Sequence, residues 1–212
     1  MFIVHGVPGD DLGLPTELIV DIACNGNCLL PGASFREVAG PLDIDLGSYD
    51  ISISISLADA ANPCGGAIAV TAEVDIAIGP VSIVIAHLDQ NGSPTITKFT
   101  SKTAPVAADE TRLTVYHTAA IPAVDLQIIA DNNDRVAAFQ GLSNGGQTFP
   151  VDLPVVASYR TLASLASGFP GRFNDPIVDI AETPIGGTAA AVFAVGSLEN
   201  NTFSAIQIVV IP

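Results

Sequence analysis

The residues of this chain that could carry catalysis begin with a serine flanked by glycines. Gly141-Leu142-Ser143-Asn144-Gly145 matches the pattern G-x-S-x-G, in which a strand-to-helix turn exposes the serine hydroxyl as a nucleophile. The next residues, Gly146-Gln147-Thr148-Phe149-Pro150, contain glycine and proline and predict no helix. Turn-forming residues explain the match. We therefore predict no catalytic residue here and no enzyme activity.

Two histidines, His5 and His117, occur at corresponding places in the two halves of the chain. An imidazole at such a place could act as a general base or as a metal ligand. A catalytic histidine needs a nucleophile and a third group that orients it, and the sequence offers no such set. We therefore favour histidines at strand ends that form hydrogen bonds with the backbone.

A short polar segment, Asp131-Asn132-Asn133-Asp134, offers the oxygen ligands that calcium prefers. It lacks the glycine and the terminal glutamate of an EF-hand loop. The same residue types form tight turns, because Asn and Asp tolerate the left-handed backbone conformation. We favour a hairpin turn, keep Asp131 and Asp134 as candidate calcium ligands, and expect no other cofactor.

All three cysteines lie in the first half of the chain. They allow three single pairings, each of which leaves one thiol. Cys24 and Cys28 flank the turn sequence Asn25-Gly26-Asn27, so a small loop disulfide between them is sterically allowed, while the role of Cys64 is open. A structural zinc site needs about four ligands, and these cysteines with scattered histidines match it poorly.

The composition argues against several partners. The 212 residues carry a net charge of −15, from 22 acidic and 7 basic residues. No basic patch can neutralise phosphates, so we expect no nucleic-acid partner, and an anionic membrane surface is disfavoured for the same reason. Hydrophobic residues make up 49% of the chain, yet no apolar run approaches the ~18–20 residues of a membrane helix. The start of the chain has no signal-peptide pattern, which indicates either a cytoplasmic protein or a leader already removed.

Short strands are the elements that must position any site. Ile51–Leu57 alternates apolar residues with serine, which predicts a strand with Ile51, Ile53, Ile55 and Leu57 in the core. No segment shows a helical stripe, and Gly, Pro and Asn turns separate the apolar runs. This pattern favours an all-β fold of antiparallel, immunoglobulin-like sandwiches. In the second half we expect strands at Leu113–His117, Val124–Ile129, Val136–Phe139, Ser158–Leu165, Ile177–Ala181, Ala189–Val195 and Ser204–Ile211.

The two halves repeat one plan, which indicates an internal duplication. We therefore predict two tandem β-sandwich domains, residues 1–102 and 112–212, joined by a linker at 103–111. The matching pairs are His5 with His117, Glu17-Leu18 with Asp125-Leu126, Leu46–Tyr49 with Val156–Tyr159, and Pro80–Ala86 with Thr188–Ala194.

These motifs resemble the domain of unknown function 4397 family of secreted and surface proteins in bacteria and archaea. Its signature reads V-x-H-x-x-P-x-A-P-A-V-D-V-Y-V, then L-P-A-G-x-Y. Val115, His117, Pro122–Leu126 and Val156–Tyr159 are similar to it. The first half fits more loosely, with Glu17 for the aspartate and a longer loop before it. The resemblance implies two copies of an extracellular β-sandwich repeat and no established catalytic residues.

An extracellular or cell-surface location, with the leader removed, adds two expectations. Disulfides persist in oxidising environments, so we predict at least one, between Cys24 and Cys28. Asn91-Gly92-Ser93 and Asn200-Asn201-Thr202 are glycosylation sequons. Both predict loops at least as much as glycans.

Three classes of function remain. Charged residues are only 14%, and together with the apolar content and the tandem sandwiches this favours a structural or adhesive protein, a filament or sheath subunit whose partner is itself. The alternative is a surface module that binds carbohydrate or calcium. Against carbohydrate, the chain has no tryptophan and three tyrosines, so aromatic platforms for glycans are scarce. An enzyme is the third class, and no residue set supports it.

The C-terminal run is the predicted assembly contact. Ile208, Val209, Val210 and Ile211 are apolar on both faces of a strand, and no charge occurs from Ser204 onward. Outer strands are usually covered or blunted with charge and proline, so we predict self-association through this edge. The competing interpretation is a central strand of its own sandwich.

Overall fold

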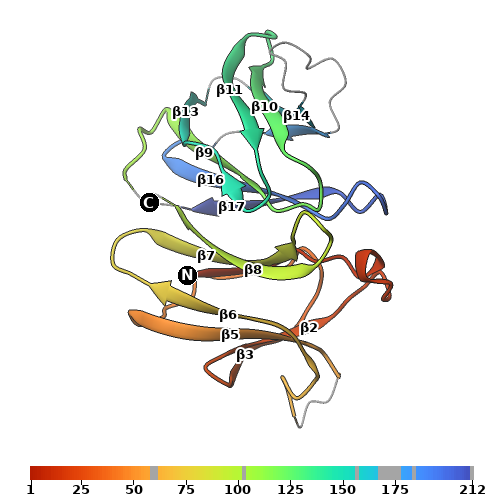
Figure 1. Ribbon diagram of the computed structural model, residues 1–212. Coiled ribbons are helices and arrows are strands. Elements are labelled where there is room, and N and C mark those ends of the chain that lie inside the picture. Colours follow the sequence, from red (N-terminus) through yellow and green to blue (C-terminus); the bar gives the residue numbers. More distant parts are fainter. Residues whose placement is uncertain (58–61, 102–103, 156–157, 167–177, 183–184, 211–212) are drawn as a thin grey trace. The chain divides into compact units, whose positions relative to one another are not determined.

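The computed structural model describes residues 1–57, 62–101, 104–155, 158–166, 178–182 and 185–210 (Figure 1). These residues form strands and one short 3-10 turn, Asp10–Leu12. Short apolar runs between Gly and Pro turns become strands because alternate side chains can then share one buried face. The predicted all-β sandwich fold is confirmed.

The strands group into two compact units. Unit 1 comprises Met1–Thr103 and Val195–Ser204, and unit 2 comprises Ala104–Ala194 and Ala205–Pro212. The segment Val195–Ser204 therefore groups with unit 1, although the repeat in the sequence assigns it to the second half. The predicted domain boundaries follow that repeat and stay a prediction.

Unit 1 contains two four-stranded sheets. Its strands are β1 Phe2–His5, β2 Val20–Cys24, β3 Asn27–Ala33, β4 Val38–Ala39, β5 Gly47–Ile55, β6 Ile68–Ile76, β7 Val81–Leu88 and β8 Pro94–Ser101. The first sheet has the order β4-β1-β7-β8, and the second has the order β3-β2-β5-β6. Figure 1 shows β7 and β8 lying over β5 and β6. Buried side chains such as Ile83 and Ile85 of β7 and Ile22 of β2 place the core between the sheets.

Unit 2 repeats this strand order. Its strands are β9 Glu110–His117, β10 Val124–Ala130, β11 Arg135–Leu142, β12 Gly146–Gln147, β13 Val151–Pro154, β14 Tyr159–Leu165, β15 Val178–Glu182, β16 Thr188–Val195 and β17 Ser204–Val210. One sheet has the order β12-β9-β16-β17, with β13 also paired to β9, and the other has the order β11-β10-β14-β15. Tyr116 of β9 and Phe193 of β16 stack in the core at 4.4 Å between ring centroids.

The registers of the two units also correspond. β1 pairs parallel with β7 so that His5 lies opposite Ala86, and β9 pairs parallel with β16 so that His117 lies opposite Ala194. All other pairs of the four sheets for which a register is described are antiparallel. The sequence match of Pro80–Ala86 with Thr188–Ala194 thus falls on equivalent strands.

One predicted correspondence is wrong. The predicted match of Glu17 with Asp125 does not hold in the strand registers. Asp125 of β10 lies opposite Ser164 of β14. At the equivalent place in unit 1, Asp21 of β2 lies opposite Ser54 of β5. The loop between β1 and β2 is long and contains the 3-10 turn, so strand β2 begins only at Val20. Because this loop is longer than the one before β10, matching the two halves by their position in the sequence paired Asp125 with Glu17 in place of Asp21.

The alternating strand β5 follows its prediction over part of its length. Ile51 and Ile53 are buried, at 1% and 5% exposure. Ile55 is 38% exposed at the end of the strand, and Leu57 is 61% exposed beyond it. The prediction that these two side chains lie in the core is wrong, because the strand ends before the second sheet covers them.

The disulfide joins Cys28 to Cys64, whose Cα atoms are 5.5 Å apart, and Cys24 is a free thiol. The predicted Cys24–Cys28 pair is therefore wrong. Asn25 and Gly26 do form the hairpin turn between β2 and β3, both with positive φ. Cys28 lies opposite Ala23 in that hairpin. Because side chains alternate along a strand, Cys24 points to the other face of the sheet.

The pairing predicts unequal effects of removing the cysteines. The cross-link closes a loop with a sequence separation of 36, which corresponds to about 3–4 kcal/mol of stability through restriction of the unfolded chain. The double variant Cys28→Ser/Cys64→Ser should lose this amount in a denaturant melt. Cys24→Ser is the control and should change the free energy of unfolding by less than ~1 kcal/mol. Equal losses in both variants would contradict the assignment.

Candidate functional site

The two equivalent histidines are buried and bonded to the backbone. His5 Nε2 donates to the carbonyl oxygen of Leu18 at 3.1 Å, and His117 Nε2 donates to that of Pro122 at 3.1 Å. Each histidine is 1% exposed. The carbonyl acceptors fix the proton on Nε2, so each ring is a neutral imidazole whose Nδ1 can accept. The predicted interpretation, a strand-end histidine bonded to backbone, is confirmed.

The two rings differ at Nδ1. In unit 2 the backbone N–H of Ala119 donates to His117 Nδ1 at 3.4 Å. In unit 1 His5 Nδ1 meets no donor within the described part of the chain. Burial is the main cause that lowers the pKa of both histidines, opposed by their backbone hydrogen bonds.

Two buried aspartates have a structural role that the sequence did not reveal. Asp21 Oδ1 accepts from the N–H of Gly32 at 2.8 Å, and Asp125 Oδ1 accepts from that of Gly141 at 2.8 Å. Both glycines have positive φ and lie where the register shifts at a β-bulge. Asp21 Oδ2 also accepts from the N–H of Cys64 at 3.1 Å, which ties the disulfide loop to β2. The repeat of the motif around Asp125 could have predicted the role of Asp21. The match of Asp125 with Glu17 prevented this.

The candidate catalytic and calcium segments are both turns. Ser143 lies in the turn between strands β11 and β12, and no helix follows it as a nucleophile elbow requires. Asp131 and Asp134 lie in the hairpin between β10 and β11, where the Asn132 side chain accepts from the N–H of Asp134 and donates to its carboxylate. Among the described residues no three His, Cys, Asp or Glu side chains gather as metal ligands would.

The predicted assembly residues lie on an outer strand. β17 is the last strand in the order β12-β9-β16-β17. Ile206 and Ile208 are buried, whereas Gln207 and Val209 face outward, Val209 with 41% exposure. The side chain of Val210 and the whole of Ile211 lie outside the described residues.

The two sequons occupy loops, and one is engaged in hydrogen bonds. Asn91 lies in the exposed turn between β7 and β8. Asn200 Nδ2 donates to Asp11 at 2.8 Å, and Thr202 Oγ1 donates to the same carboxylate at 2.6 Å within unit 1. A glycan on Asn200 would leave a single N–H on Nδ2 for the bond to Asp11.

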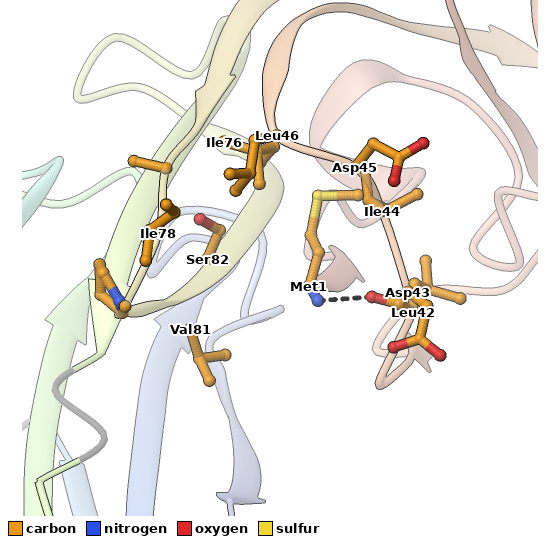
Figure 2. Close-up of a pocket in the computed structure, with 13 residues that line it drawn as sticks. Met1, Leu42, Asp43, Ile44, Asp45, Leu46, Ile76, Ile78, Val81 and Ser82 are labelled. Carbon is orange, nitrogen blue, oxygen red and sulfur yellow. Dashed lines mark hydrogen bonds between the residues drawn. The ribbon is translucent and has the colours of Figure 1, made fainter.

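Unit 1 has an open groove beside the start of the chain (Figure 2). It has a volume of about 480 Å³ and lies between residues 42–46 and the turn from β6 to β7. The amino group of Met1 donates to the carbonyl oxygen of Leu42 at 2.7 Å, and burial lowers its pKa. Leu46 and Ile78, at 57% and 80% exposure, give an apolar wall opposite Asp43. The lining thus combines apolar side chains with the amino group of Met1, the carboxylates of Asp43 and Asp45 and the hydroxyl of Ser82.

Unit 1 also has a smaller apolar cavity between its two sheets, with a volume of about 130 Å³. Leu12 and Leu18 of the β1–β2 loop close one side, Ile53 of β5 and Ala86 of β7 form the walls, and Ala69 of β6 lies where the cavity reaches the surface. The lining surface is entirely apolar. A cavity of this kind accepts apolar groups and does not hold ordered water.

Comparison with family models gives one match, to the domain of unknown function DUF4397, over residues 3–127. The match spans more than half of the chain. The chain belongs to the DUF4397 family.

Other comparisons add little. No curated protein matches this DUF4397 chain. Ten chains of solved structures match, among them the Bacillus anthracis TIE protein at 12% identity and a TM-score of 0.28, too low to support an argument. The match covers 92% of this chain and 33% of that one, so this chain spans about a third of its length. Within the described residues, no helix has the length and apolar character needed to cross a membrane.

The family match runs from β1 to β10 and therefore includes His5, Asp21, His117 and Asp125. It ends within the second half, so a second complete copy of the DUF4397 domain stays a prediction. The residues that the motif shares between the halves are the ones that anchor backbone in both units. The family signature thus marks structural positions of the sandwich.

The buried histidines predict a loss of stability on acidification. The pKa of His5 and of His117 is lowered in the folded state, below the ~6.5 of an unfolded chain. Between the lowered pKa of the folded state and ~6.5, the unfolded chain binds more protons than the folded chain. The contribution of the two histidines to the free energy of unfolding is therefore complete above pH ~6.5 and is lost as the pH falls. The pair contributes a slope of at most ~2.7 kcal/mol per pH unit.

Urea melts between pH 7.5 and 5 measure this slope. The variant His5→Gln/His117→Gln keeps a side-chain donor in place of Nε2 but cannot gain a proton. Its free energy of unfolding should decrease less with falling pH than that of the natural chain. An unchanged slope would show that other groups cause the pH dependence.

Proposed function

We propose that this protein is a non-enzymatic structural or adhesive component of the extracellular space or cell surface, and that it assembles with copies of itself into a filament or sheath. The observation that carries the proposal is the outer strand β17. From Ser204 to Val210 it has no charge and no proline. Unpaired N–H and C=O groups of such a strand are a template for another chain.

The other outer strands of the sheets formed by the described residues are all blunted. β4 and β12 have two residues each. β3 and β11 contain a bulge, and β13 contains Asp152 and Pro154. β6 carries Glu73 and Asp75, β8 carries Lys98, and β15 carries Asp179 and Glu182. Because these features oppose edge-to-edge pairing, β17 stands apart as the strand able to add to a neighbour's sheet.

Two further features support the location and the role. The Cys28–Cys64 disulfide fits an oxidising compartment. Several large apolar side chains are exposed, one on β6 and the others in loops, and they offer apolar contact surface. Those with more than half of their surface exposed are Leu46, Leu57, Ile68, Ile78, Phe149 and Ile185.

Charges placed on β17 test the proposal. In Gln207→Lys/Val209→Lys both substituted side chains point outward, so the fold should persist while assembly is weakened. The matched control is Val136→Lys/Gln140→Lys on β11, where Val136 is 42% exposed against 41% for Val209. Light scattering and negative-stain microscopy give the readout.

The natural chain and the β11 control should form large assemblies, and the β17 variant should need a much higher concentration to assemble, with an unchanged melting temperature. A natural chain that is a monodisperse monomer at high concentration would overturn the proposed function. Assembly of the β17 variant equal to that of the natural chain would remove β17 as the contact.

A further inference from the structure

Phe149 has the highest exposure of the large apolar side chains that the structure describes, at 84%. It lies between β12 and β13 in unit 2. Burial of a phenylalanine contributes about 1.5–3 kcal/mol, so a fold that leaves this ring in water forgoes that stabilisation. An exposed aromatic ring of this kind is a typical anchor of a protein interface.

The backbone on both sides of Phe149 holds the ring outward. Thr148 is buried, its N–H donates to the carbonyl oxygen of Val115 at 2.9 Å, and its Oγ1 accepts from the N–H of Val115 at 3.1 Å. Pro150 follows with a fixed φ. The buried, hydrogen-bonded Thr148 on one side and Pro150 on the other thus hold the backbone at Phe149 with its ring in solvent. A preorganised ring loses little freedom on binding.

The apolar cavity of unit 1 has the size and chemistry for such a ring. Its volume of about 130 Å³ approaches the ~150 Å³ of an apolar cavity that admits benzene. The exposed atoms of its lining are apolar, although His5 is among the lining residues, and Ala69 is an exposed residue of that lining. A small side chain at that position leaves the entrance open.

We infer that Phe149 of one molecule inserts into this cavity in unit 1 of a second molecule. The inference rests on the proposed self-assembly and names a side-chain contact for it. The ring and the cavity are different surfaces, so the contact is head-to-tail. Contacts of this type leave one free ring and one free cavity at the two ends of the growing assembly, and they extend into filaments unless the geometry closes a ring.

Two variants with matched controls test the contact. Phe149→Ala removes the ring, and Val136→Ala truncates an exposed side chain on the control strand β11, at 42% exposure. Ala69→Leu narrows the cavity, and Ala67→Leu makes the same change at an exposed residue that does not line it. Phe149→Ala and Ala69→Leu should each raise the concentration for half-assembly about 10-fold or more, as truncation of an interface anchor does. The two controls should assemble as the natural chain does.

Mixing the two variants makes the test specific. With Gln207→Lys/Val209→Lys added to both variants to block β17, Phe149→Ala retains an open cavity and Ala69→Leu retains the ring. One productive contact is then available, and sedimentation should detect a mixed dimer that neither variant forms alone. Benzene should compete with that dimer. Normal assembly of Phe149→Ala, no mixed dimer, or saturation with benzene without any loss of assembly would overturn the inference. If the Phe149 contact fails one of these tests but the β17 variant assembles poorly, the proposed function is still supported. A natural chain that is monomeric would contradict both the proposed function and this inference.

Discussion

The parallel pairing of β1 with β7, repeated by β9 with β16, is the interaction on which each unit depends. Parallel neighbours require a long crossover connection, and here the connection contains the whole second sheet together with the short strands that pair with β1 or β9, namely β4 in unit 1 and β12 and β13 in unit 2. Closing the pair therefore sets the two sheets of a unit face to face. A histidine ends the first strand of each pair, and its ring bonds the carbonyl of the segment that leads into the second sheet. The buried aspartate then fixes the bulge of the adjacent hairpin.

The histidine and aspartate side chains of the repeated motif thus form hydrogen bonds with backbone atoms. His117 has both ring nitrogens bonded, and Asp125 accepts from a bulge glycine. The features left without an internal role are apolar and exposed: the uncharged outer strand β17, the ring of Phe149 and the cavity of unit 1. Surfaces of this kind favour association over chemistry, which links the fold to the proposed function.

The sequence predicted what depends on local pattern. Strand alternation at Ile51 and Ile53 and the backbone role of His5 and His117 followed from period and spacing. The disulfide pairing of residues far apart in the sequence could not be predicted in this way. Cys28 and Cys64 have a sequence separation of 36, and strand β5 lies between them in the chain. Side chains from several strands and one loop line the cavity, so no linear sequence motif predicts it. Phe149 would be assigned to a core by its type, and only the hydrogen bonds of Thr148 explain its exposure.

Sedimentation velocity of the natural chain over a wide range of concentrations tests the central claim most directly. Open association through unlike surfaces predicts a mass distribution that grows continuously with concentration and does not stop at a fixed size. A single monomeric species at every concentration would contradict the account. A closed dimer that reaches a constant mass would contradict it as well, since it would show that only like surfaces pair, as β17 with β17 would, and that no unlike contact extends the assembly.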